Sequence, residues 1–301
     1  MIVAAALWLA LCTGFAATAP RLAASAWPDV AVRLIVSAAV ALTASGVFVL
    51  GSAAATWAGQ QPTIAAVSRL SASKLHATSP ISPAAAALAA VALLAATGSL
   101  GVRGWRSWAA HHEVRAAVGR AGGDDVVVLD DRRIDAFATP GRHGRIVVTT
   151  GLLSALEPAE RAALFAHERA HRRYAHAWWR LAMQLTVAVN PLLRHVRRTA
   201  DHAMERAADE AAAAEVGDRR LVARTVARVA LLRKGGTASI GLALSASGGD
   251  IPARVHALLK PASSRGRGAA IALFVFLAGA LVAAVLMQRT TDSVFDAAHL
   301  R

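Results

Sequence analysis

The chain has a single cysteine, Cys12, among its 301 residues. One cysteine cannot form a disulfide within the chain, and it cannot supply the clustered thiolates of a cysteine-based metal site. The sequence also lacks an internal repeat and a glycine-rich nucleotide-binding loop. A metal site in this protein would therefore use histidine and carboxylate side chains.

Charge is missing from four long stretches of the sequence. Hydrophobic residues make up 55% of the chain, which is too apolar for an ordinary soluble enzyme. Stretches of about 20 apolar residues cross a bilayer as helices. We therefore predict four transmembrane helices, at residues 1–19, 34–58, 83–102 and 269–288. The first could instead be a cleaved signal peptide, although no basic residue precedes it, and the alanine-rich third could be a buried core helix.

Acidic residues are few: the chain has 19 Asp and Glu against 33 Lys and Arg. Residues 103–268, which we call the inserted region, hold 27 of these basic and 16 of these acidic residues. No recognition helix, zinc-finger spacing or aromatic stacking motif accompanies the charge, so we expect no direct binding to nucleic acid. The positive-inside rule instead predicts that the inserted region faces the cytoplasm, beside the lipid bilayer of a bacterial cytoplasmic membrane.

The inserted region carries the motif His-Glu-x-x-His at residues 167–171. On a helix His167 and His171 project from one face, with Glu168 beside them, which is an arrangement that binds zinc and activates its water. A catalytic zinc site needs a third protein ligand, and we expect this to be Glu205. Glu168 then fits the role of general base. Asp209 lies one helical turn after Glu205, where it could accept a hydrogen bond from a zinc-bound histidine.

Hydrophobic patterning predicts a small α/β unit around this motif. Two β-branched runs, 126–129 and 145–150, are expected to form paired strands. Helices are expected at 152–174 with the histidine pair, at 199–216 with Glu205, and at 219–233. The segment 175–189 is expected to be a helix that ends at Asn190-Pro191 and lies at the bilayer surface, covers the site or packs in the core.

Several motifs together resemble the BlaR/MecR-type membrane metallopeptidases, and they are also similar to the HtpX and CAAX-prenyl-protease group. They are residues 135–141, 146–153, the His-Glu-x-x-His helix, 190–192 and 204–210. The resemblance implies a mainly α fold, with four transmembrane helices and a cytoplasmic α+β zinc peptidase domain of gluzincin type between the third and fourth spans. It also implies one zinc ion per chain, bound by His167, His171 and Glu205, with no other small-molecule cofactor.

The resemblance further implies how substrate and oxyanion are held. The strand Ile146, Val147, Val148 and Thr149 would be an edge strand, to which an extended substrate adds. An internal strand is the alternative. His202 and His143 are candidates for stabilising the oxyanion, although an exposed loop histidine at 143 and a role in polar contacts at 202 also fit.

The sequence departs from the antibiotic-sensing members in one respect. Those members carry a penicillin-binding domain after the last span, whereas only residues 289–301 follow here, so we expect no direct antibiotic sensing. Ser71 and Lys74 match the acylating Ser-x-x-Lys pattern, but its companion motifs are missing.

These features predict an integral membrane zinc metalloendopeptidase that cleaves a cytoplasmic or membrane-associated protein. The resemblance suggests a winged-helix transcriptional repressor in a signalling pathway as the substrate. A peptidase for membrane-protein quality control and a signalling scaffold that retains zinc without turnover are the alternatives.

Overall fold

The structure, a computed structural model, describes residues 1–68, 71–120, 125–139, 144–235, 251–260 and 267–298. It is mainly helical, and four of its helices are long and apolar enough to cross a membrane, as the sequence predicted. They are α1 (Ile2–Ser25), α2 (Pro28–Gly59), α5 (Pro83–Arg120) and α12 (Arg267–Ala298). Each extends beyond the apolar run that predicted it.

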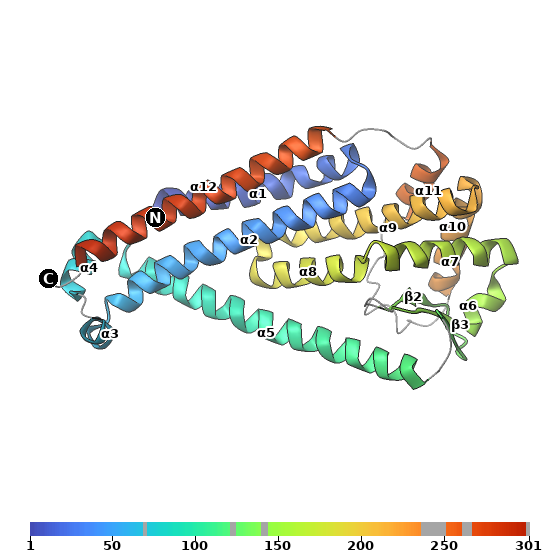
Figure 1. The fold of residues 1–301 in the computed structure, drawn as a ribbon, viewed down its shortest axis with the longest axis horizontal. Helices are drawn as coiled ribbons and strands as arrows, with labels where there is room; N and C mark the ends of the chain where they lie inside the picture. The colour runs from blue at the N-terminus through green and yellow to red at the C-terminus, as the bar shows by residue number, and fades with distance from the viewer. Residues whose placement is uncertain (69–70, 121–124, 140–143, 236–250, 261–266, 299–301) are drawn as a thin grey trace.

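The helices α1, α2 and α12 lie side by side, whereas α5 diverges from them toward its C-terminal end (Figure 1). Only 11% of the apolar window of α5 is buried inside the chain. A core helix would be covered by protein, so this exposure favours a lipid-facing span over the core-helix alternative. In contrast, Cys12, Phe15 and Ala19 of α1 are fully buried or nearly so, and α1 is therefore part of the packed fold.

Two short helices, α3 (Pro62–Val67) and α4 (Ala72–Thr78), connect α2 with α5. The Oγ atom of Ser71 accepts a hydrogen bond of 3.3 Å from the backbone N–H of Lys74. This serine therefore caps the N-terminus of α4, which accounts for its position without any acylating role.

The inserted region contains a three-stranded sheet of β1 (Val126–Leu129), β2 (Ala136–Ala138) and β3 (Ile146–Thr149), in the order β1-β3-β2. The two predicted strands do pair, in parallel, with Val126 beside Ile146. The third strand, β2, pairs antiparallel with the other side of β3. Because both sides of β3 are occupied, the prediction that Ile146, Val147, Val148 and Thr149 form an edge strand is wrong.

The predicted helix 152–174 is two helices, α6 (Thr150–Ala155) and α7 (Pro158–Arg173). Glu157 and Glu160 form a reciprocal capping box at the start of α7, and Pro158 takes its first position, so a new helix begins there. The remaining elements are α8 (His176–Val189), η1 (Pro191–Leu193), α9 (Arg194–Val216), α10 (Arg219–Gly235) and α11 (Ile251–Leu259). Gly217 ends α9 in the left-handed conformation, with φ of 77°.

The largest hydrophobic core joins the apolar spans to the inserted region. Phe15, Ile35 and Leu42 of α1 and α2 share it with Leu193 and Met204 of the α8–η1–α9 hairpin. At the tip of this hairpin, the side-chain amide of Asn190 lies 3.5 Å from the Cys12 sulfur in the middle of α1. The helix α9 therefore rests directly on α1 and α2, and α8 packs in the core rather than only at a surface.

Candidate metal centre

Helix α7 carries the predicted motif, with its apolar side buried through Ala163, Leu164 and Ala170. This packing turns both motif histidines to the same side, where their Nε2 atoms lie 3.0 Å apart. Their side chains are 14% and 12% exposed. Glu168, the predicted general base, lies next to His167 and is buried at 7% exposure.

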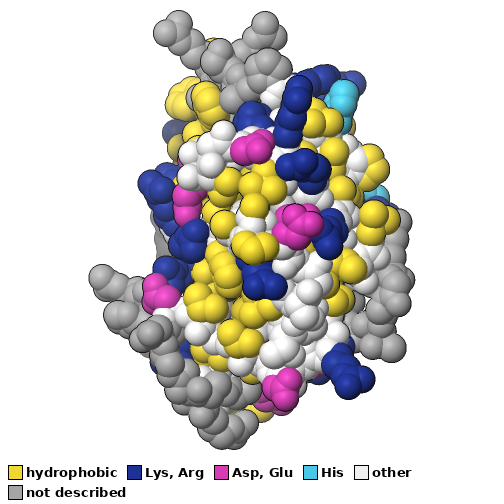
Figure 2. Space-filling view, turned by 90° about the vertical axis from the view of Figure 1, so that its right-hand side faces the viewer, with side chains coloured by type: hydrophobic (Ala, Val, Ile, Leu, Met, Phe, Trp, Pro, Cys, Tyr) yellow, Lys and Arg dark blue, Asp and Glu magenta, His cyan; other side chains and the backbone are white. Residues whose placement is uncertain are grey.

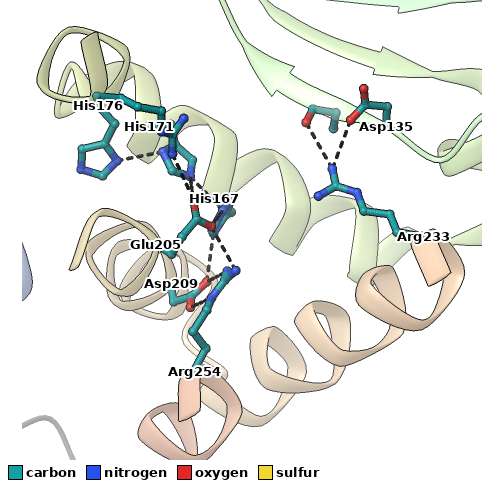
Figure 3. Close-up of polar contacts among 10 residues, drawn as sticks. Asp135, His167, His171, His176, Glu205, Asp209, Arg233 and Arg254 are labelled. Atoms are coloured by element: carbon teal, nitrogen blue, oxygen red, sulfur yellow. Dashed lines mark hydrogen bonds and ion pairs between the residues drawn. The ribbon is translucent and has the colours of Figure 1, made fainter. Parts of the chain in front are cut away.

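Helix α9 packs against α7 and brings Glu205 to the two histidines. Its carboxylate oxygens lie 3.7 Å from Nε2 of His167 and 3.6 Å from Nε2 of His171. One potential ligand atom from each of the three residues lies within 4.8 Å of the others, and Figure 3 shows how the three side chains converge. The sequence therefore predicted correctly which three side chains come together.

The three residues fit a zinc ion in both chemistry and spacing. Ligand atoms bound to a tetrahedral zinc ion at about 2.0–2.1 Å lie about 3.3 Å from one another. The two Nε2 atoms are 3.0 Å apart, Oε2 of Glu205 lies 3.7 Å from His167 and Oε1 lies 3.6 Å from His171, so the carboxylate is near this distance from each ring. Two imidazole nitrogens and one carboxylate oxygen also form the donor set of His₂Glu catalytic zinc sites.

Asp209 lies behind His167, as the sequence predicted. Its Oδ1 atom is 3.0 Å from Nδ1 of His167, and its side chain is 2% exposed. Arg254 donates to both oxygens of Asp209, from Nε at 2.7 Å and from Nη2 at 2.7 Å. The Nη1 atom of Arg254 lies 3.0 Å from Oε2 of Glu205. The buried guanidinium of Arg254 on α11 thus links Glu205 to Asp209.

A second arginine reaches Glu205 from α8. Nη2 of Arg180 lies 3.2 Å from Oε1 of Glu205, and its Nε lies 3.5 Å from Asp201. Both oxygens of Glu205 therefore face a guanidinium. These two arginines balance the negative charge that Glu205 and Asp209 bring into the protein interior.

The pKa values of these side chains follow from burial and from these ion pairs. Burial alone would raise the pKa of Glu205, but its interactions with His171, Arg254 and His167 outweigh burial and hold that pKa well below its ordinary value. Burial raises the pKa of Glu168. Burial lowers the pKa of His171, which keeps its ring neutral as a ligand must be. For His167, burial is outweighed by Asp209 and Glu205, which raise its pKa to about 9, so a metal ion would displace a proton there.

The roles of the two oxyanion candidates stay predictions. His202 is partly buried on α9, three residues before Glu205. His143 lies outside the described residues, and nothing follows for it.

Sequence reasoning missed three residues of this centre: Arg180, Arg254 and His176. Nδ1 of His176 lies 2.8 Å from Nδ1 of His171, and burial lowers the pKa of His176 to about 3. The sequence places His176 only five positions after His171, which was a usable signal. Arg254 is far away in sequence, and only the packing of α11 on α9 and α10 brings it to the site.

Comparison with known proteins supports a metallopeptidase of the M48 group. The model of peptidase family M48 matches residues 109–196, which include the His-Glu-x-x-His motif. The protease HtpX homolog of Acidiphilium cryptum (strain JF-5) is 52% identical over 52 residues, which are 16% of this chain and 18% of that protein. The chain therefore spans about a fifth of this curated relative. No solved structure matches. The assignment to the BlaR/MecR type stays a prediction.

Proposed function

We propose that this chain is a membrane-embedded zinc endopeptidase. The observation that carries the proposal is the convergence of His167, His171 and Glu205 within 4.8 Å, beside the buried carboxyl of Glu168. The similarity to M48 peptidases and the four apolar helices support it.

A bound zinc ion would polarise the scissile carbonyl and lower the pKa of a water molecule. Glu168 would accept the proton of that water and return it to the leaving amine. Its buried position raises its pKa from the ordinary carboxylate value, which favours a group that must both accept and donate a proton. Asp209 would hold the ring of His167 in the orientation that directs Nε2 to the metal.

We propose β2, in place of β3, as the strand to which a substrate adds. Asp135 accepts a backbone hydrogen bond from Thr149 of β3, and Thr139 donates one to Arg145 directly before β3, so the peptide groups of Ala136 and Ala138 between them point to the opposite edge. Helix α7 packs against β2, which places this edge on the side of the metal-binding helix. An extended peptide bound there would run past the metal centre.

The substrate is proposed to be a protein at or in the membrane. Glu205 directly follows Met204, which is fully buried in the core shared with α1 and α2, so the metal centre is fixed next to the spans. Figure 2 shows Lys and Arg side chains spread over the end of the molecule farthest from the spans, as expected for a cytoplasmic face. A winged-helix transcriptional repressor that reaches this face is the substrate that we propose for a signalling role.

Zinc content and proteolysis of the detergent-purified chain test the proposal together. Wild type should hold one zinc ion and cleave an unfolded protein such as denatured casein. Glu205→Gln should lose zinc, whereas Glu168→Gln should keep zinc and lose cleavage. Glu215→Gln, on the exposed side of α9, is the matched control and should change neither. Zinc without any Glu168-dependent cleavage would leave the scaffold alternative, and a wild type without zinc would contradict the proposal.

A further inference from the structure

Each motif histidine has a polar partner behind its metal-facing nitrogen. For His167, Nε2 faces the other ligands and Nδ1 lies 3.0 Å from Asp209. For His171, Nε2 faces the other ligands and Nδ1 lies 2.8 Å from Nδ1 of His176. In Figure 3 His176 lies on the side of His171 that faces away from His167.

The chemistry of imidazole defines the direction of this second hydrogen bond. A neutral histidine that binds a metal through Nε2 carries its only ring proton on Nδ1. His171 must then donate that proton, and the nearby Nδ1 of His176 must accept it. His176 must therefore be neutral, with its own proton on Nε2. The pair can form this bond in one tautomeric arrangement only.

The chain is built to hold His176 at this place. The side chain is 1% exposed, and the residue begins α8 directly after a tight turn from α7. Ala175 makes that turn in the left-handed conformation, with φ of 55°, which alanine adopts only at a cost. Because the turn spans only a few residues, the orientation of His176 relative to His171 is determined locally.

We propose that His176 is a positioning residue of the metal centre, which accepts the Nδ1 proton of His171 and so directs Nε2 of His171 to zinc. The inference rests on the zinc site of the proposed function. It differs from the role of Asp209, because the acceptor is an uncharged ring. The alternative is that His176 only fills space between α7 and α8.

Two substitutions of nearly the same shape separate these readings. In His176→Asn the side-chain oxygen takes the place of Nδ1 and can accept the same proton. In His176→Leu a methyl group takes that place and cannot. Zinc affinity of each purified full-length variant is measured by competition with a chromophoric chelator. Loss of a hydrogen-bond partner of a metal-binding histidine weakens metal binding about 10–100-fold, so we expect this loss for His176→Leu. His176→Asn should stay within a few-fold of wild type.

The control is His256→Leu, which makes the same change at an exposed histidine of α11 and should leave zinc affinity unchanged. Equal zinc affinity of His176→Leu and wild type would overturn the proposal, as would His176→Asn binding as weakly as His176→Leu. If His176→Leu does not fold, His176→Ala also removes the acceptor and takes its place. A wild type that binds no zinc would contradict the proposed function itself, which is a different outcome.

Discussion

At the scale of single residues, Gly151 and Ala175 precede and follow helix α7 in the sequence, and at each position the presence or absence of a Cβ atom affects stability. Gly151 is the second residue of α6, which follows β3 directly, and its N–H donates to the carbonyl of Asp131 at 2.8 Å. A Cβ atom there would overlap the backbone carbonyl of Arg132. Neither backbone segment can move freely, because Thr149 also donates to the carbonyl of Arg133 at 2.6 Å.

We therefore predict that Gly151→Ala destabilises the protein by about 1–3 kcal/mol, the usual cost of overpacking. Thermal unfolding of the detergent-purified protein measures the change. Gly104→Ala is the matched control, since a Cβ at Gly104 in α5 meets no atom within 4 Å. That change should be neutral or stabilise the helix by up to about 1 kcal/mol. Equal unfolding temperatures for the two variants would contradict the argument.

At Ala175 we expect the reverse of Gly151, namely that glycine is tolerated as well as alanine. Its left-handed backbone costs alanine about 1–2 kcal/mol, while glycine adds about 0.5–1 kcal/mol of unfolded-state entropy. Ala175→Gly should therefore leave the free energy of unfolding unchanged or raise it slightly. Ala177→Gly, two positions later inside α8, should lower it by about 0.5–1 kcal/mol. Chemical denaturation compares the two, and a loss at Ala175→Gly as large as that at Ala177→Gly would refute the role of the turn.

At the scale of elements, α11 matters because it carries Arg254 to the metal centre. Arg254 is 6% exposed and pairs with both Asp209 and Glu205. Arg219 holds the other end of α11, where it donates to the carbonyls of Leu258 at 2.9 Å and Ala257 at 3.1 Å. Without this guanidinium, the buried carboxylate of Asp209 would lose its arginine partner, and Glu205 would keep only Arg180.

We predict that Arg254→Gln destabilises the zinc-free protein by about 3–5 kcal/mol, the cost of breaking a buried ion pair. Arg254→Lys keeps the charge but not the paired donors, and it should lie between Arg254→Gln and wild type. Arg169→Gln breaks a pair with Glu215 whose side chains are 43% and 49% exposed, and this control should cost at most about 1 kcal/mol. Denaturation in the presence of a chelator measures all three. A cost for Arg254→Gln no larger than for Arg169→Gln would disprove the bridging role.

The elements also show what the sequence could and could not predict. Apolar length predicted the four long helices, and the spacing of His167 and His171 predicted that their rings share one face of a helix, because both follow from local periodicity. Strand β2 has only three residues, too few for an alternating pattern, and missing it led to the wrong edge strand. The break between α6 and α7 depends on the capping box at Glu157, which the continuous apolar pattern around it concealed.

At the scale of the whole molecule, the spans and the inserted region share one core. Met183 of α8 and Leu193, Val196 and Met204 of the hairpin are fully buried against α1 and α2. From the four apolar stretches of the sequence, we expect a separate domain between the third and fourth transmembrane helices, similar to a soluble domain attached to a membrane anchor. In the structure, α1 and α2 instead support the candidate metal centre directly. Helix α9 carries Glu205 on one side, and on the other side it carries the apolar residues that pack against α1 and α2.

The shared core predicts that residues 103–268 do not form a soluble protein alone. Without α1 and α2, the buried face of the hairpin would be exposed to water, and exposed apolar patches of this kind drive aggregation. Expressed alone, the fragment should sediment after lysis, and co-expression with residues 1–102 should bring it into the detergent-soluble membrane fraction. The matched variant replaces Met183, Leu193 and Val196 by Gln within the fragment, and its soluble share should rise because the apolar face is removed. A wild-type fragment that is soluble and monomeric would show that the inserted region folds independently, and that the metal centre does not need the spans.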